Sequence, residues 1–137
     1  MSLTNRKPRS VDTTTIYRDI ELFTQELERV ADRCPKSISW QHTAERSLSL
    51  IEEALDLYCA AYITPNQTEE KRRLLTVAYS ALQREYTLLQ RLHQRSRNSR
   101  VRVLTDDQFG ALSEKTYVLM SQLKGFLAKT CKSLDAE

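Results

Sequence analysis

Arginine is the residue type whose number and spacing in this 137-residue chain indicate a chemical role. Residues 71–102 hold nine basic side chains and one acidic side chain, a balance of +8, whereas the whole chain carries +3. Eight of the nine basic side chains are arginines. The planar guanidinium group matches the geometry of phosphate oxygens and stacks on flat rings, so this concentration favours a nucleic-acid backbone as the ligand.

Four of these arginines have the spacing of residues on one side of a helix. Their separations of 11, 7 and 4 residues place them within an arc of about 40°. Three more arginines follow in the segment 96–103, which has no helical period and which we expect to be an exposed loop. The candidate phosphate-binding residues are therefore Arg73, Arg84, Arg91, Arg95, Arg97, Arg100 and Arg102.

Ion pairs within the protein are the alternative explanation of the helical arginines. Acidic residues on other predicted helices could supply the partners: Glu21, Glu26, Glu28, Glu45 and Glu52. For the loop arginines the nearest acids are Asp106 and Asp107, which suit the start of the following helix. Both explanations stay open for the helix, and exposure is favoured for the loop.

Two tyrosines on the predicted helix that carries the arginines also have two explanations. Tyr79 and Tyr86 are seven residues apart and could stack on bases, but packing at the edge of the core accounts for them more simply. We expect Trp40, near the start of the second predicted helix, to anchor packing.

The sequence lacks the patterns that catalytic and metal centres require. His42 and His93 lie on different predicted helices, and neither belongs to a Glu-x-x-His motif. No glycine-rich phosphate loop, no G-x-S-x-G motif and no C-x-x-C pair occurs. We therefore expect no enzyme activity, no metal and no cofactor.

Glu85 is an acidic residue in an unexpected position. Helical geometry places it near the middle of an apolar face, where a buried carboxylate needs a charged or hydrogen-bonding partner. A paired carboxylate with a structural role is the favoured explanation, and a functional acid is the alternative.

Apolar residues recur at intervals of three and four, which predicts helices. The predicted helices span about 13–34, 38–63, 67–95 and 106–133, after a flexible basic tail over 1–12. Thr105 and Gln108 match a capping box at the start of the last helix. With 2 glycines and 3 prolines, a β-sandwich or a glycine-loop nucleotide fold is excluded. The fold class that remains is all-α, an antiparallel up-down-up-down four-helix bundle over 13–134.

Further features bear on location and assembly. No apolar run reaches the roughly 20 residues that span a bilayer, and no secretory signal is recognisable, so we expect a cytoplasmic protein. The second predicted helix has a wide apolar arc, which suits either a central helix or a subunit interface.

Gly110 and Gly125 lie inside the last predicted helix, where glycine costs about 1 kcal/mol relative to alanine. We expect close packing at Gly125 to offset that cost.

The order of several short motifs resembles a family of small four-helix bundles. These motifs are the turn Cys34-Pro35-Lys36, the leucine-rich stretch AYSALQREYTLLQRLHQR, the helix start TDDQF at 105–109 and the ending LKGFL at 123–127. The family comprises the accessory variability determinant proteins of diversity-generating retroelements and proteins encoded in ribosomal RNA intervening sequences. The resemblance extends over residues 17–133.

This resemblance implies a ring-shaped homopentamer whose basic surface binds RNA or DNA and a partner reverse transcriptase. Such a protein supports mutagenic reverse transcription without catalysing a reaction. Two other functions remain compatible with the residues. One is a structural or protein-interaction bundle without a nucleic-acid role, and the other is an accessory protein of a toxin-antitoxin or mobilisation system.

Overall fold

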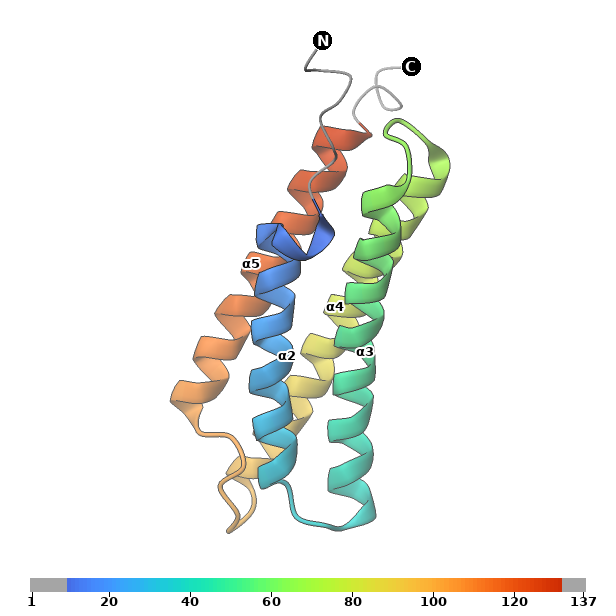
Figure 1. The fold of residues 1–137 in the computed structure, drawn as a ribbon. Helices are drawn as coiled ribbons and strands as arrows, with labels where there is room; N and C mark the ends of the chain where they lie inside the picture. The colour runs from blue at the N-terminus through green and yellow to red at the C-terminus, as the bar shows by residue number, and fades with distance from the viewer. Residues whose placement is uncertain (1–9, 132–137) are drawn as a thin grey trace.

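The fold is a bundle of four long helices, described for residues 10–131 by a computed structural model. The helices are α2 (Thr15–Arg33), α3 (Ile38–Ile63), α4 (Glu69–Arg97) and α5 (Asp106–Thr130), preceded by one 3-10 turn, η1 (Val11–Thr13). Consecutive helices run in opposite directions (Figure 1). The predicted all-α, antiparallel four-helix bundle is therefore confirmed.

The ends of the chain lie outside the described residues. The predicted basic tail over 1–12 falls there except for its last three residues, of which Val11 begins η1. Its basic side chains, Arg6, Lys7 and Arg9, are all outside the described range. The last predicted helix, over 106–133, likewise extends beyond the described residues, and α5 ends at Thr130.

Side-chain caps define where three helices begin. The Thr14 hydroxyl accepts a hydrogen bond from the Tyr17 amide, and the Thr68 hydroxyl accepts one from the Lys71 amide. At α5 the predicted capping box is present, because Thr105 and Gln108 each accept a hydrogen bond from the other's backbone amide. These bonds satisfy amides that have no partner within the helix.

All four helices contribute fully buried side chains to one core. The largest apolar ones are Ile20, Phe23, Ile51, Tyr58, Leu75, Leu82, Leu89, Leu92, Leu104, Leu119 and Leu123. α3 and α4 pack against each other most extensively, whereas α2 and α5 make the fewest contacts of the neighbouring pairs. Alanines on the facing sides, such as Ala54 and Ala81, are fully buried and allow α3 and α4 to approach closely. The wide apolar arc of α3 is covered in part by α2 and in part by α4.

The two glycines of α5 are not sites of close packing. A β-carbon added at Gly110 or Gly125 would meet nothing within 4 Å, and both residues are exposed. The packing expected at Gly125 is therefore absent within the described chain. The cost of glycine in a helix is not offset there by a contact that this chain makes.

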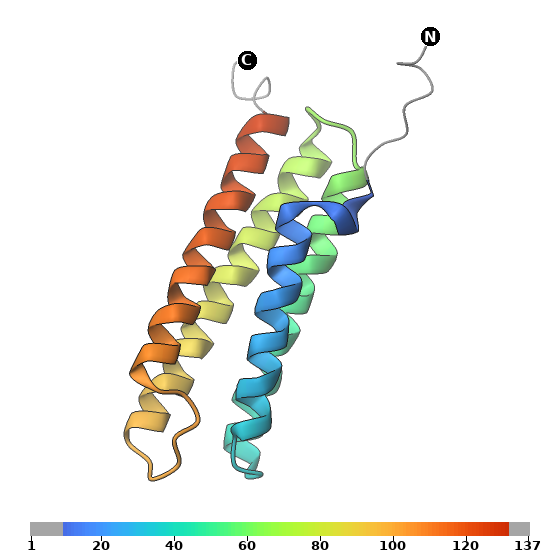
Figure 2. The same cartoon turned by 60° about the vertical axis from the view of Figure 1, so that its left-hand side comes forward.

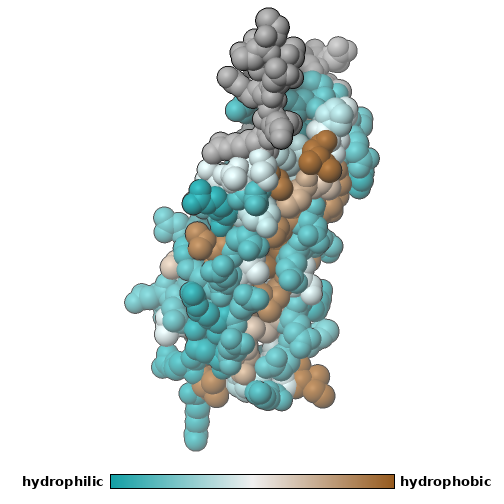
Figure 3. Space-filling view, in the orientation of Figure 1, coloured by the Kyte–Doolittle hydropathy of each residue, from teal (hydrophilic) through white to brown (hydrophobic). Residues whose placement is uncertain are grey.

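The surface is mostly hydrophilic on the face shown in Figure 3, with apolar side chains scattered over it and aligned between α2 and α3. No helix within residues 10–131 is both long enough and apolar enough to cross a bilayer. Figures 1 and 2 show that the α2–α3 turn and the α4–α5 loop lie at the same end of the bundle. This shared end brings together basic residues that are far apart in the sequence.

Candidate functional site

Seven basic residues gather at the end of the bundle formed by the α2–α3 turn and the α4–α5 loop. We call this group the basic end, and its members are Arg33, Lys36, Arg91, Arg95, Arg97, Arg100 and Arg102. The same segments hold three acidic residues, Asp32, Asp106 and Asp107, which leaves a net charge of +4 from seven positive and three negative groups. Such a local excess attracts anionic partners.

Most arginines of the basic end have no acidic partner among the described residues. No carboxylate in residues 10–131 lies within 4.0 Å of the guanidinium groups of Arg91, Arg95, Arg100 or Arg102. Arg97 is the exception, since its Nε lies 3.9 Å from Asp106 Oδ1. All five side chains are exposed, so their charges are available to a ligand.

The remaining two predicted site residues lie elsewhere on α4 and are paired. Arg84 Nη2 lies 3.1 Å from Glu53 Oε2 on α3, and Arg73 Nη2 lies 2.7 Å from Glu70 Oε1. At about 1.5 Å per residue, Arg73 is some 33 Å along the helix from Arg95. The structure thus brings five of the seven predicted arginines together. The other two form ion pairs, which were the alternative explanation, but their partners Glu70 and Glu53 are not among the acids expected from the sequence.

The loop that carries Arg100 and Arg102 is held in place by Ser96. The Ser96 hydroxyl is buried and accepts hydrogen bonds from the Val103 and Leu104 amides, each at 3.1 Å. The sequence suggested that the segment 96–103 is an exposed loop, and this is wrong in part. The helix α4 continues to Arg97, and Val103 is buried in the core. In the sequence, the signal of this anchor is the apolar pair Val103-Leu104 that follows the arginine-rich segment.

Two further contacts fix the loop to its neighbours. Arg33 Nε on α2 donates a hydrogen bond to the Val103 carbonyl at 3.0 Å. His93 Nε2 on α4 lies 2.7 Å from Asp106 Oδ1, and its ring stacks on Phe109 at a centroid distance of 4.1 Å. The hydrogen bond from His93, with smaller effects of the Arg97, His93 and Arg102 charges, lowers the pKa of the Asp106 carboxyl. The loop arginines are thus carried on an ordered support.

A shallow recess beside this loop combines an aromatic ring with arginines. Trp40 belongs to the core, as expected of a packing anchor, but its ring also borders this recess of about 500 Å³ between α3 and the end of α4. The Arg95 guanidinium carbon lies over the ring, 5.3 Å from its centroid. Arg91, Gln94 and Asn98 line the same recess. The sequence does not show that Trp40 lies beside the arginines, because they are about 50 residues apart.

The two tyrosines that could have stacked on bases do not join this group. Tyr86 packs between helices, with its ring 5.4 Å from the Tyr117 ring and 6.3 Å from the Phe109 ring. Tyr79 lies beside Leu75 and Leu123, farther up the bundle. The packing explanation therefore describes Tyr86, and Tyr79 lies away from the basic end.

Glu85 is fully buried between α3 and α4. The Ser47 hydroxyl donates a hydrogen bond to Glu85 Oε2 at 3.1 Å, while Oε1 has no hydrogen-bond partner among the described residues. Burial raises the pKa of the Glu85 carboxyl to about 8, against the opposing effect of the Ser47 hydrogen bond. The group is therefore protonated at neutral pH, which explains how it occupies an apolar core without a cation beside it.

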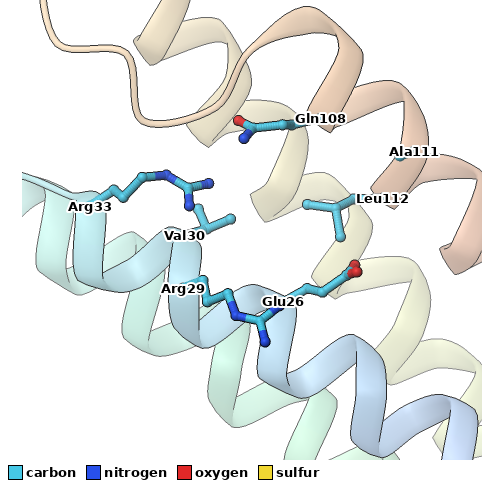
Figure 4. Close-up of a pocket in the computed structure, with 7 residues that line it drawn as sticks. All are labelled: Glu26, Arg29, Val30, Arg33, Gln108, Ala111 and Leu112. Carbon is cyan, nitrogen blue, oxygen red and sulfur yellow. The ribbon is translucent and has the colours of Figure 1, made fainter.

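The groove between α2 and α5 holds other recesses. Figure 4 shows one of about 200 Å³, in which Glu26, Arg29 and Arg33 of α2 face Gln108 and Leu112 of α5. Within the part of the chain that the structure describes, no group of three or more His, Cys, Asp or Glu side chains is placed to hold a metal ion.

Comparison with known proteins does not suggest a function, so the function is argued from the basic end. No protein-family model, no curated protein and no solved structure matches the chain.

Proposed function

We propose that this protein binds the phosphate backbone of RNA or DNA through its basic end. The observation that carries the proposal is the presence of four exposed arginines, Arg91, Arg95, Arg100 and Arg102, whose guanidinium groups have no carboxylate of the described residues within 4.0 Å. An arginine that is not engaged by a carboxylate is free to bind phosphate oxygens, and each such contact releases counterions from the nucleic acid.

The support of the loop strengthens this proposal. Ser96, Arg33 and the His93–Asp106 pair hold the segment that carries Arg100 and Arg102, so little conformational freedom is lost when these arginines bind. A charged loop without such anchors would have to become ordered on binding.

The sequence resemblance supports a narrower role as the accessory protein of a diversity-generating retroelement. In this role the protein binds the template RNA or its cDNA together with a reverse transcriptase, and the reverse transcriptase performs all of the chemistry. A homopentamer, which the same resemblance implies, would present five basic ends to one strand and raise its affinity by multivalency. A reverse-transcriptase gene beside a pair of near-identical repeats in the genomic neighbourhood would support this role, and its absence would contradict it.

A matched pair of double variants tests the nucleic-acid proposal. Arg100→Ala/Arg102→Ala and Arg73→Ala/Arg84→Ala remove the same charge, but the first pair belongs to the basic end and the second pair is bonded to acids. Each lost phosphate contact lowers the affinity about five- to eightfold at roughly 0.1 M salt. We expect the loop variant to bind a fluorescent RNA strand at least tenfold more weakly than the control variant, as measured by anisotropy. Equal affinities would contradict the assignment.

A protein-interaction bundle is the second candidate function. Its supporting observation is the exposure of large apolar side chains along α2 and α5, where Leu22, Tyr117 and Val118 are 57%, 56% and 48% exposed. An oligomer that light scattering detects, but that does not bind RNA at low salt, would favour this candidate over the first.

A further inference from the structure

The recess beside Trp40 has the composition of a site for a flat, polar, anionic ligand. It combines an indole ring, two arginines without an acidic partner among the described residues, and two side-chain amides. We infer that it binds one unpaired base of a nucleic-acid strand, so that the basic end prefers single strands to duplex. This inference rests on the proposed function and specifies its substrate.

Arg95 provides the stacking surface for the base. Its guanidinium carbon lies over the Trp40 ring, 5.3 Å from the ring centroid, and the Arg95 side chain is exposed, so the guanidinium group is held beside the recess and is accessible to a base. Unpaired bases stack on aromatic rings and on guanidinium planes. Trp40 is 8% exposed, so it acts from beneath as the support that keeps Arg95 in place.

The other polar groups of the recess come from the same face of α4. Arg91, Gln94, Arg95 and Asn98 follow one another at intervals of three, one and three residues, which places them side by side. Arg91 can bind the phosphate next to the stacked base. The Gln94 and Asn98 amides make no side-chain hydrogen bond among the described residues, so they can donate to and accept from the edge of a base.

The same geometry disfavours a duplex. A paired base has both faces stacked on its neighbours and its Watson–Crick edge occupied, so it can offer neither surface to the recess. A duplex can still bind the loop arginines through its phosphates. The recess therefore adds affinity for single strands alone.

Trp40 is the one tryptophan of the chain, so its fluorescence reports on this recess directly. The test titrates the full chain at low salt with three polymers of equal length: a single strand, the corresponding blunt duplex, and a strand of abasic sugar-phosphate units. We expect the intact single strand to bind roughly tenfold more tightly than the abasic strand and to change the Trp40 emission. The abasic strand should bind through its phosphates without that change.

Two other results would overturn the inference. If intact and abasic strands bind equally and neither changes the Trp40 emission, the recess binds no base, while the proposed binding of phosphates stands. If none of the three polymers binds at low salt, the proposed function fails, and this inference fails with it.

A conservative substitution separates stacking from charge. Arg95→Lys keeps the positive charge but removes the guanidinium plane, and Arg84→Lys is the matched control at an arginine paired with Glu53 outside the recess. We expect Arg95→Lys to lose most of the roughly tenfold preference for the intact strand over the abasic strand, whereas Arg84→Lys keeps that preference. An unchanged preference in Arg95→Lys would contradict the role of Arg95.

Discussion

The Glu85 carboxyl makes the stability of the bundle depend on pH. Burial raises its pKa from 4.5 to about 8 in the folded chain, so the folded state keeps a proton that the unfolded state releases above its own pKa. Stability from this group is complete below pH 4.5, declines as the pH rises, and is lost once the pH passes about 8. Once the pH is above both pKa values, each unit of difference between them corresponds to a loss of about 1.4 kcal/mol in the free energy of unfolding.

Substitution of Glu85 by glutamine tests this pH dependence. Glu85→Gln keeps the size of the side chain and a group that can accept from Ser47, but it does not titrate. Relative to this variant, we expect the wild-type free energy of unfolding to fall between about pH 5 and about pH 9. Urea unfolding followed by circular dichroism measures the difference. Parallel pH profiles of the two proteins would show that Glu85 is not buried as a neutral acid.

Glu85 also shows what helical periodicity can and cannot predict about a single residue. The position of Glu85 on an apolar face was visible in the sequence, because it depends on spacing within one helix. Its partner Ser47 is 38 residues away on α3, and that pairing depends on how α3 and α4 pack. For the same reason the ion pair of Arg84 with Glu53 on α3 could not be predicted, whereas the pair of Arg73 with Glu70 follows from spacing within one helix.

At the scale of the elements, the α4–α5 loop depends on one hydroxyl group. Ser96→Ala leaves the Val103 and Leu104 amides without an acceptor in a buried place. Each buried donor without a partner costs about 1–3 kcal/mol, so for two donors we expect a loss of about 2–6 kcal/mol in the free energy of unfolding. Denaturant unfolding measures it.

Ser99→Ala is the matched control for that loop. The Ser99 hydroxyl accepts one hydrogen bond, from the Val101 amide, at an exposed position where water can replace it. We expect a loss below about 1 kcal/mol. Equal losses in the two variants would mean that Ser96 does not anchor the loop.

The glycines of α5 provide a test of the helix itself. Gly125→Ala adds a methyl group that meets nothing within 4 Å, and the backbone there has no positive φ. We expect the free energy of unfolding to rise by about 1 kcal/mol, because alanine favours the helix. Gly110→Ala, which is equally unobstructed, should behave in the same way. A destabilised Gly125→Ala chain would indicate that another molecule packs on this face.

The helices were the most predictable elements. Their apolar periods, Pro35 and the Thr105–Gln108 capping box are local features, and they placed α3 and the start of α5 where the structure has them. The loop was less predictable because no period describes it. Its shape is set by Ser96 and Arg33, whose hydrogen bonds span 7 to 70 residues of sequence.

At the scale of the whole molecule, the topology explains the charge distribution better than the sequence does. A net charge of +3 is small for the chain, but the antiparallel arrangement places the α2–α3 turn beside the α4–α5 loop. Arg33 and Lys36 therefore join five arginines from α4 and its loop at one end. Five of the nine basic residues over 71–102 thus lie at one end of the bundle, and the other four lie farther along α4.

The salt dependence of binding measures how many phosphate contacts the basic end makes. For a single strand, the logarithm of the binding constant falls with the logarithm of salt concentration, with a slope of about 0.7 for each phosphate contact. We predict that Arg100→Ala/Arg102→Ala lowers this slope by about 1.4, while Arg73→Ala/Arg84→Ala leaves it near the wild-type value. A binding constant that does not change with salt, or an equal decrease in both variants, would contradict the assignment of phosphate binding to the basic end.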